Sequence, residues 1–358
     1  MKTIELYIPA KVMLAGEYAV LRGGHSLAAT LNCGMSVKVN WDPTAAQWEI
    51  HSDIWNAPQF VQDDRTPQSD ILCRAVQFAA KRTGLHGGRV EINSSIEIKH
   101  GIGSSSALRL GICAAFLSLR DGSGENAKIP LEAVQTAWQL QSEGQGIASG
   151  YDIVTQYAGG LVEFRYEYDD NKWKPHWFRH ELGAINQLVH VFVGGVGAPT
   201  TETIQTMSSW LEGGNRFDKL VDTSEGLIDA FNTALQWPDP TSMRKLCHAC
   251  GNARQMFATS PHFPQILGAE LARIPGIDQR WSWKTTGAGG EDAILLIGTK
   301  EDTHRAASRL ADLGWHPVGH TFVAEGTRVR HFNASESLET ESPVPSRASK
   351  SAMREFLG

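Results

Sequence analysis

The sequence lacks long hydrophobic runs and lacks an excess of positive charge. No apolar stretch in its 358 residues approaches the roughly 20 residues that a membrane-spanning helix needs. The formal net charge of −6 argues against a general surface for nucleic acid or anionic membrane. Lys11 and Glu17 interrupt the N-terminal apolar stretch, which does not have the layout of a signal peptide. We therefore expect a cytoplasmic protein that binds neither nucleic acid nor membrane.

Cysteine is scarce, and its spacing excludes a disulfide framework. The five cysteines are Cys33, Cys73, Cys113, Cys247 and Cys250. An odd, scattered set is typical of reduced thiols in the cytoplasm. Cys247 and Cys250 form a lone C-x-x-C pair inside a helical pattern, with no second pair at zinc spacing. We expect two small buried thiols there rather than a metal or redox site.

The remaining composition is that of a globular protein, with 41% hydrophobic and 20% charged residues. The length allows a large core and favours two domains. Apolar residues alternate as in strands over 2–14, 35–51 and 88–98, and they take helical spacing over 69–83. The second half is mostly helical with a few strands, so we expect an α+β fold rather than a doubly wound sheet.

The most informative segment is a Gly/Ser loop, Lys99-His100-Gly101-Ile102-Gly103-Ser104-Ser105-Ser106-Ala107-Leu108, that leads into an apolar helix. Gly101 and Gly103 allow a backbone with positive φ that can approach a ligand closely. The N-terminus of a helix offers free N–H groups and a partial positive charge, which suit a phosphate. No Gly-Lys-Ser/Thr follows, so this is not the usual P-loop. By itself the loop fits either a phosphate site or a capped turn.

Two further glycine-rich segments accompany this loop. Residues 8–20 contain Pro9-Ala10-Lys11 followed by Gly16-Glu17, and residues 284–293 contain Gly287-Ala288-Gly289-Gly290. Three such blocks in this order resemble the GHMP kinase superfamily. The resemblance implies a two-domain fold, with an N-terminal domain like domain 2 of ribosomal protein S5 and a ferredoxin-like C-terminal domain. We place an N-terminal ATP-binding domain at 1–190, a C-terminal domain at 191–332 and a flexible tail at 333–358.

The resemblance implies ATP as phosphoryl donor and Mg²⁺ as its companion. The expected nucleotide-binding residues are Gly101, Gly103, Ser104, Ser105, Ser106 and Ala107. In the superfamily the second serine of the central motif holds the magnesium, which here is Ser105, although a helix-capping role fits too. Mevalonate kinases supply a second metal ligand from a glutamate ahead of the catalytic aspartate. Glu143 is the nearest carboxylate. The spacing between Glu143 and Asp152 is about two residues shorter than in the mevalonate kinase pattern, so a solvated helix end stays the alternative.

Two residues are expected to perform the chemistry. Asp152 stands in Ser149-Gly150-Tyr151-Asp152, which resembles the Ser-Gly-x-Asp block that carries the catalytic aspartate of the family. A carboxylate there can accept or orient the proton of an acceptor hydroxyl, although a capping aspartate would look the same. Lys11 lies in an apolar strand and should reach a polar cleft or the surface. In the family this lysine lies near the transferring phosphate.

The expected acceptor site draws on several segments. Its residues are Lys11, Glu17, Tyr18, His25, Ser149, Gly150, Gly287, Ala288, Gly289 and Gly290. Glu291 departs from the family pattern, which usually has glycine there, and Asp292 matches it. Arg109 either meets a phosphate or lies on the outer face of its helix.

The opening motif resembles phosphomevalonate kinases more than mevalonate kinases, which commonly have histidine at the position of Tyr18. Residues 194–201 resemble the junction segment of phosphomevalonate kinases. We therefore expect 5-phosphomevalonate as acceptor and 5-diphosphomevalonate as product. Mevalonate kinase, diphosphomevalonate decarboxylase and a non-catalytic ligand-binding homologue stay open as alternatives, as does a homodimer.

Overall fold

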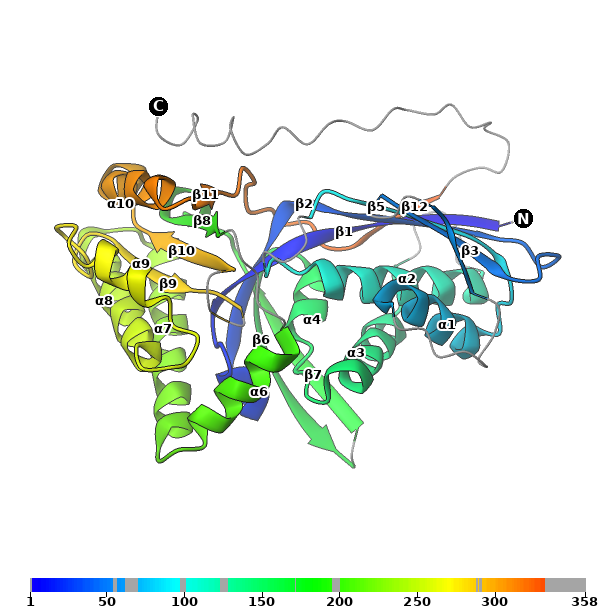
Figure 1. Ribbon diagram of the computed structural model, residues 1–358, viewed down its shortest axis with the longest axis horizontal. Helices are drawn as coiled ribbons and strands as arrows, with labels where there is room; N and C mark the ends of the chain where they lie inside the picture. Colours follow the sequence, from blue (N-terminus) through cyan, green and yellow to red (C-terminus); the bar gives the residue numbers. More distant parts are fainter. Residues whose placement is uncertain are drawn as a thin grey trace.

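The computed structural model describes residues 2–53, 57–61, 70–96, 101–122, 128–170, 172–194, 200–287, 289 and 292–331 (Figure 1). These residues form two sheets with helices packed on them, which confirms the α+β class. Among them, no helix combines the length and apolarity that crossing a membrane requires. The expected tail over 333–358 lies outside the described residues.

The larger sheet has eight strands. Six of them follow the order β12-β1-β2-β5-β3-β4, and β6 and β7 extend from β2. Every pair is antiparallel except β3 with β5. The strands are β1 (Lys2–Ala15), β2 (Ser26–Trp41), β3 (Trp48–Ser52), β4 (Gln59–Val61), β5 (Gly88–Ser94), β6 (Leu161–Asp169), β7 (Lys172–His180) and β12 (Arg328–His331).

One face of this sheet is covered by helices of the N-terminal half (Figure 1). They are α1 (Ile71–Thr83), α2 (Ser104–Asp121), α3 (Leu131–Gln145) and α4 (Tyr151–Ala158). The expected helix over 69–83 is confirmed as α1, and Asp70 caps it by accepting hydrogen bonds from the amides of Leu72 and Cys73 at 2.8 and 3.2 Å. Every residue of α2 from Ser106 to Leu119 is buried, so this helix is central to the core.

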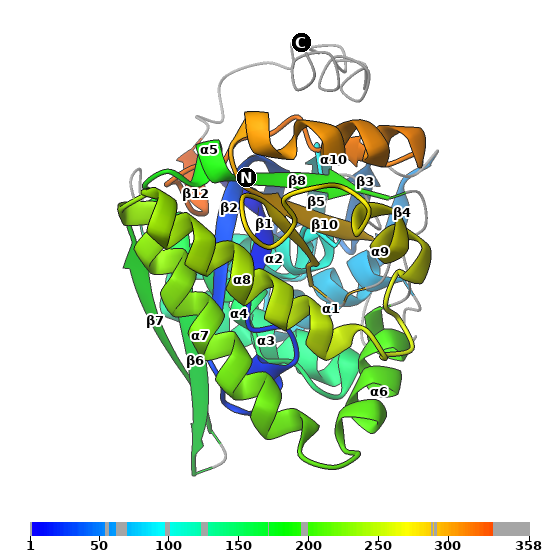
Figure 2. The ribbon, with the colours of Figure 1, turned by 90° about the vertical axis from the view of Figure 1, so that its left-hand side faces the viewer.

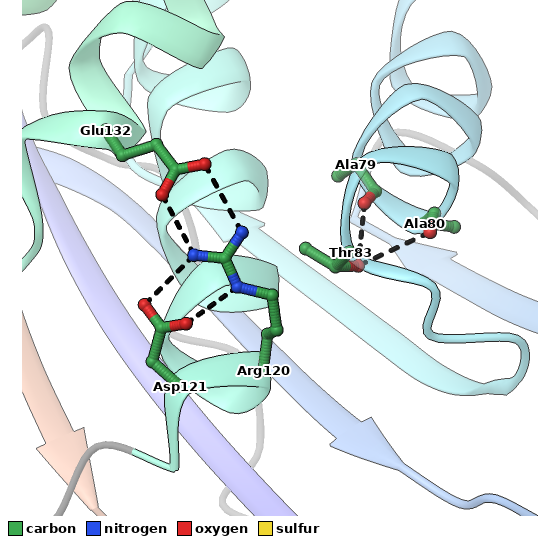
Figure 3. A network of polar contacts seen from close by, with 6 residues as sticks. All are labelled: Ala79, Ala80, Thr83, Arg120, Asp121 and Glu132. Atoms are coloured by element: carbon green, nitrogen blue, oxygen red, sulfur yellow. Dashed lines mark hydrogen bonds and ion pairs between the residues drawn. The ribbon is translucent and has the colours of Figure 1, made fainter.

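A surface ion-pair network joins α2 to α3, as Figure 3 shows. The Arg120 guanidinium at the end of α2 donates to Asp121 and to Glu132 in the first turn of α3, at 2.6 and 2.9 Å. Nearby, the Thr83 hydroxyl donates to the Ala79 carbonyl at the end of α1. The network holds together two helices whose other ends reach the site described below.

The smaller sheet has the strand order β11-β8-β10-β9. Its strands are β8 (Val189–Val193), β9 (Ser282–Thr285), β10 (Ala293–Ile297) and β11 (His316–Pro317). The two faces of β10 alternate between two cores: Leu295 and Ile297 join the large core, while Ile294 and Leu296 join a second cluster. A sheet buried on both faces needs helices on both sides.

Those helices come from the C-terminal half of the chain. They are α6 (Thr200–Leu211), α7 (Arg216–Gln236), α8 (Pro240–Phe257), α9 (Gln265–Leu271) and α10 (Lys300–Asp312), and short α5 (Ile185–Leu188) precedes β8. In Figure 2, α7 and α8 run side by side along one flank and α10 lies on the other side of β8 and β10. Strand β12 returns to pair with β1 in the larger sheet. The division into domains at 190 and 332 stays a prediction.

The cysteines and the strand pattern over 35–51 can be compared with the structure. All five cysteines are free and buried, and Cys247 and Cys250 lie on α8 as expected. Burial raises the pKa of the Cys247 thiol to about 12, so it is unreactive at neutral pH. The strand pattern expected over 35–51 is confirmed at its two ends and interrupted between them, because β2 ends at Trp41 and β3 begins at Trp48. Between them, Asp42 Oδ1 accepts from the Thr44 amide at 2.9 Å and turns the chain.

Candidate active site

Three segments that are far apart in the sequence line one cavity of about 340 Å³. Lys11 comes from β1, Ser105 from the start of α2 and Asp152 from the start of α4. Tyr18 and Gly287 line the same cavity. The structure therefore brings together the cation, the hydroxyl and the carboxylate that the sequence singled out.

Lys11 is buried within β1 and held on two sides. Its Nζ donates to the Gly101 carbonyl and to the Tyr151 hydroxyl, both at 3.0 Å. Burial by itself lowers the pKa of Lys11, but Tyr151 and the carboxylates of Asp152 and Glu17 raise it, and the net pKa lies above the ordinary value. The ammonium therefore stays charged beside the cavity.

The Gly/Ser loop gains its shape from Gly103, which precedes α2 with φ 95°. A Cβ at this position would lie only 3.0 Å from Lys11 Cγ and from Gln156 Nε2. Glycine thus lets the loop lie directly against the lysine stem, while Gln156 Nε2 donates to the Gly103 carbonyl at 3.0 Å.

The serines of the loop divide into two kinds. Ser106 is fully buried, and its hydroxyl donates to the Gly103 carbonyl at 3.1 Å. Ser104 is partly exposed and Ser105 is exposed, and both line the cavity with Gly101 and Gly103. Ala107 is fully buried and is not among the residues that line the cavity, so its contact with a nucleotide stays a prediction.

Asp152 lies in the first turn of α4, where a helix N-terminus favours an anion. Its Oδ2 accepts from Gln141 Nε2 and its Oδ1 accepts from the Ile153 amide, both at 3.0 Å. Preceding residues Ser149 and Gly150 set up the helix start, and buried Ser149 also lines the cavity. The two hydrogen bonds fix the carboxylate while leaving lone pairs for an acceptor group.

Gln141 was missed by the sequence analysis. It is buried on α3, it lines the cavity, and its Oε1 has no hydrogen-bond partner within the described part of the chain. Glu143, by contrast, is exposed, accepts from Gln139 at 3.2 Å and is not among the cavity residues. The spacing itself carried the signal, since the position two residues before Glu143 is the one that the mevalonate kinase pattern indicates.

Glu17 and Lys284 form a buried ion pair, with side chains 7% and 3% exposed. The Lys284 ammonium also donates to the Thr285 carbonyl at 2.7 Å. Glu17 therefore lies behind the cavity rather than in it, and it lines a smaller space next to Tyr18. Tyr18 itself has φ 60° and is buried, which raises its pKa well above the ordinary value.

The third glycine segment approaches the first loop. A Cβ on Gly287 would lie 3.7 Å from the Gly101 carbonyl, and buried Asp292 lines the cavity beside them. Gly289 lines the smaller space next to Tyr18. Ala288, Gly290 and Glu291 lie outside the described residues, as do Lys99 and His100.

His25 and Arg109 lie in surroundings other than those expected from the sequence. His25 lies away from the cavity, where its Nδ1 is 2.7 Å from Glu163 Oε1, and His180 Nε2 is 2.9 Å from the other oxygen of that carboxylate. Arg109 is buried rather than on an outer helix face, and its guanidinium donates to the Ser105 carbonyl at 3.3 Å. Burial lowers the pKa of Arg109, and nearby Asp152 opposes that effect.

Comparison with known proteins adds independent information. The family described as GHMP kinases N terminal domain matches residues 70–160. A mevalonate kinase of Archaeoglobus fulgidus is 26% identical, over 80% of this chain and 89% of its own length. A phosphomevalonate kinase of a Streptomyces species is 24% identical, over 91% of this chain and 98% of its own.

Among solved structures, phosphomevalonate kinase of Streptococcus pneumoniae, in complex with phosphomevalonate and AMPPNP, is similar with a TM-score of 0.68. The alignment covers 90% of this chain and all of that one at 16% identity. At this identity the likeness shows the fold and nothing finer.

Proposed function

Because the chain belongs to the GHMP kinase superfamily, we propose that it is a small-molecule kinase that transfers the γ-phosphoryl group of ATP to a mevalonate-pathway acceptor. The observation that carries the proposal is the convergence of Lys11, Ser105 and Asp152 on one cavity. Phosphoryl transfer needs positioning and charge neutralisation more than covalent chemistry. A cation, a hydroxyl at a helix N-terminus and a carboxylate supply those needs.

Lys11 is proposed to neutralise charge on the transferring group. A lysine ammonium has three donors, and two are used by the Gly101 carbonyl and the Tyr151 hydroxyl. The third can donate to a phosphoryl oxygen in the cavity. Since the pKa of Lys11 is raised, the charge is present throughout the neutral pH range.

Asp152 is proposed to orient the acceptor hydroxyl or to accept its proton. Gln141 and the Ile153 amide hold its two oxygens at 3.0 Å, so the carboxylate keeps one orientation. An acceptor placed in the cavity between Tyr18 and Asp152 would present its hydroxyl to the free lone pairs.

The oxygens that could hold magnesium are those of Ser105 and Gln141. Ser105 is exposed where it lines the cavity, and the buried Oε1 of Gln141 has no partner among the described residues. Hydroxyl and amide oxygens are suitable ligands for this cation. The described residues contain no cluster of three or more His, Cys, Asp or Glu that could hold a metal. We therefore propose that Mg²⁺ is held mostly by the nucleotide phosphates, whose charge it neutralises when bound.

The proposed acceptor is 5-phosphomevalonate. The similarity to a phosphomevalonate kinase over 91% of this chain and the position of Tyr18 at the cavity support it. Mevalonate is the second candidate, because three relatives of comparable identity, 22% to 26%, are mevalonate kinases.

A coupled assay of ADP release with 5-phosphomevalonate, mevalonate and 5-diphosphomevalonate tests the proposal. We expect the highest kcat/KM with 5-phosphomevalonate, with the diphosphate identified by ³¹P resonance. A preference for mevalonate would select the second candidate. Tight ATP binding without turnover of any acceptor would contradict kinase activity and favour a ligand-binding homologue.

A further inference from the structure

Two tryptophans lie beneath the loop that leads to Asp152. Trp138 is on α3 and Trp173 is on β7, and their rings stack with centroids 4.8 Å apart and planes inclined by 3°. Trp173 is buried, and Tyr168 packs on Trp138 from the exposed side with centroids 6.2 Å apart. The stack therefore joins a helix and a strand that are not neighbours in the sequence.

Each indole donates a hydrogen bond to the loop. Trp138 Nε1 donates to the Ala148 carbonyl at 2.9 Å, and Trp173 Nε1 donates to the Ser149 carbonyl at 3.1 Å. An indole has one donor, so both are used here. Two consecutive carbonyls are thus held by rings that also hold each other.

Gly150 lets the chain lie directly on these rings. Its φ is 82°, and a Cβ would come 2.7 Å from Trp173 Cζ2 and 2.8 Å from Trp138 Cδ1. The next two residues are Tyr151, which binds Lys11, and Asp152. The rings therefore lie directly against the residue that precedes the first turn of α4.

We infer that Trp138 and Trp173 form a clamp that positions Tyr151 and Asp152 for the reaction. The inference rests on the proposed function. Neither indole is among the residues that line the cavity, so both act through the loop and are positioning residues. Phosphoryl transfer depends on such positioning, since a displacement of about 1 Å can cost about a hundredfold in rate.

Trp138→Phe and Trp173→Phe test the clamp, because each keeps a ring and removes the N–H donor. We expect kcat to fall about tenfold in each, as the loss of one hydrogen bond would produce, with KM for ATP within about twofold. Amide exchange of residues 151–154 should rise while the melting temperature changes little. The double variant should lose less than the product of the two effects, because both donors hold one loop.

Trp177→Phe is the matched control. Trp177 lies on the same strand and packs edge-on against Tyr157 with centroids 6.4 Å apart. We expect normal kcat and normal exchange at 151–154. The clamp is overturned if the first two variants match this control in both measurements.

The exchange measurement separates this inference from the proposed function. If no acceptor is turned over by the wild type, the proposed function fails, while exchange at 151–154 still decides the clamp. Should a variant not fold, the wild-type ¹H–¹⁵N spectrum serves instead. Two slowly exchanging indole N–H signals, assigned to Trp138 and Trp173, support the clamp, and rapid exchange of both contradicts it.

Discussion

At the scale of single residues, Asp152 is the group whose loss should matter most. Asp152→Ala removes the carboxylate that would orient or deprotonate the acceptor, so we expect kcat to fall at least about a hundredfold. Glu143→Ala is the matched control, since this carboxylate is exposed on the neighbouring helix. Steady-state kinetics with the best acceptor measure both. Near-normal turnover in Asp152→Ala would remove Asp152 from the mechanism, and a large loss in Glu143→Ala would restore the metal role that the sequence suggested.

Lys11→Met separates charge neutralisation from nucleotide binding. The substitution keeps the length of the buried side chain and removes the donor to Gly101 and Tyr151. We expect kcat to fall more than ATP affinity, because the charge should matter most on the transferring group. Kinetics and direct nucleotide titration measure the two effects, with Lys38→Met on the adjacent strand β2 as control. A pure loss of affinity would make Lys11 a binding residue.

At the scale of elements, the two ends of α2 allow a comparison of two glycines. Gly103 and Gly122 both have positive φ, but a Cβ on Gly103 would meet Lys11 and Gln156, whereas nothing lies within 4 Å at Gly122. Alanine at either site should cost about 1 kcal/mol of unfolding free energy from backbone strain. Gly103→Ala should in addition raise KM for ATP several-fold, because it displaces the loop.

Denaturant unfolding and kinetics on the two alanine variants check this difference. Equal KM values for Gly103→Ala and Gly122→Ala would show that the shape of the loop does not govern nucleotide binding. Unequal KM values are the expected result, with Gly103→Ala at least as destabilising as Gly122→Ala because its Cβ meets Lys11 and Gln156.

At the scale of elements, the sequence predicts the helices whose ends carry local signals. Helix α1 has an aspartate cap and an apolar stripe, and α4 follows a glycine, so both carry local signals. The break between β2 and β3 does carry a local signal, because the alternation changes phase between Trp41 and Trp48, which are an odd number of residues apart, and Asp42 and Pro43 lie between them. Both strands pair with β5, which comes later in the chain, so the strand order, unlike the break, is decided by tertiary pairing.

The residues of the candidate site likewise fall into those that lie in local motifs and those whose partners are distant in the sequence. Lys11, Ser105 and Asp152 lie in motifs that can be read locally, and they meet in the cavity. Glu17 pairs with Lys284, which is 267 residues away, and Trp138 stacks on Trp173 from another element. Such partners carry no local signal, because burial and distance are decided by the packed chain.

At the scale of the whole molecule, the Glu17–Lys284 pair connects the end of β1 in the larger sheet to β9 in the smaller one. Thr286 adds a second connection, donating to the Met13 carbonyl at 2.6 Å. Removing one partner of a buried pair leaves an uncompensated charge, which costs about 3–5 kcal/mol, whereas replacing both can be nearly neutral. We therefore expect Glu17→Gln and Lys284→Met each to destabilise the protein more than the double variant does.

Urea unfolding of the wild type, the two single variants and the double variant gives the coupling free energy. The exposed pair Arg22–Glu212, with side chains 59% and 66% exposed, is the control and should show a coupling of about 1 kcal/mol or less. Since Glu17 adjoins Tyr18, the double variant should regain stability but keep a raised KM for the acceptor. Additive single effects would mean that the ion pair contributes nothing specific to the connection between the two sheets at the cavity.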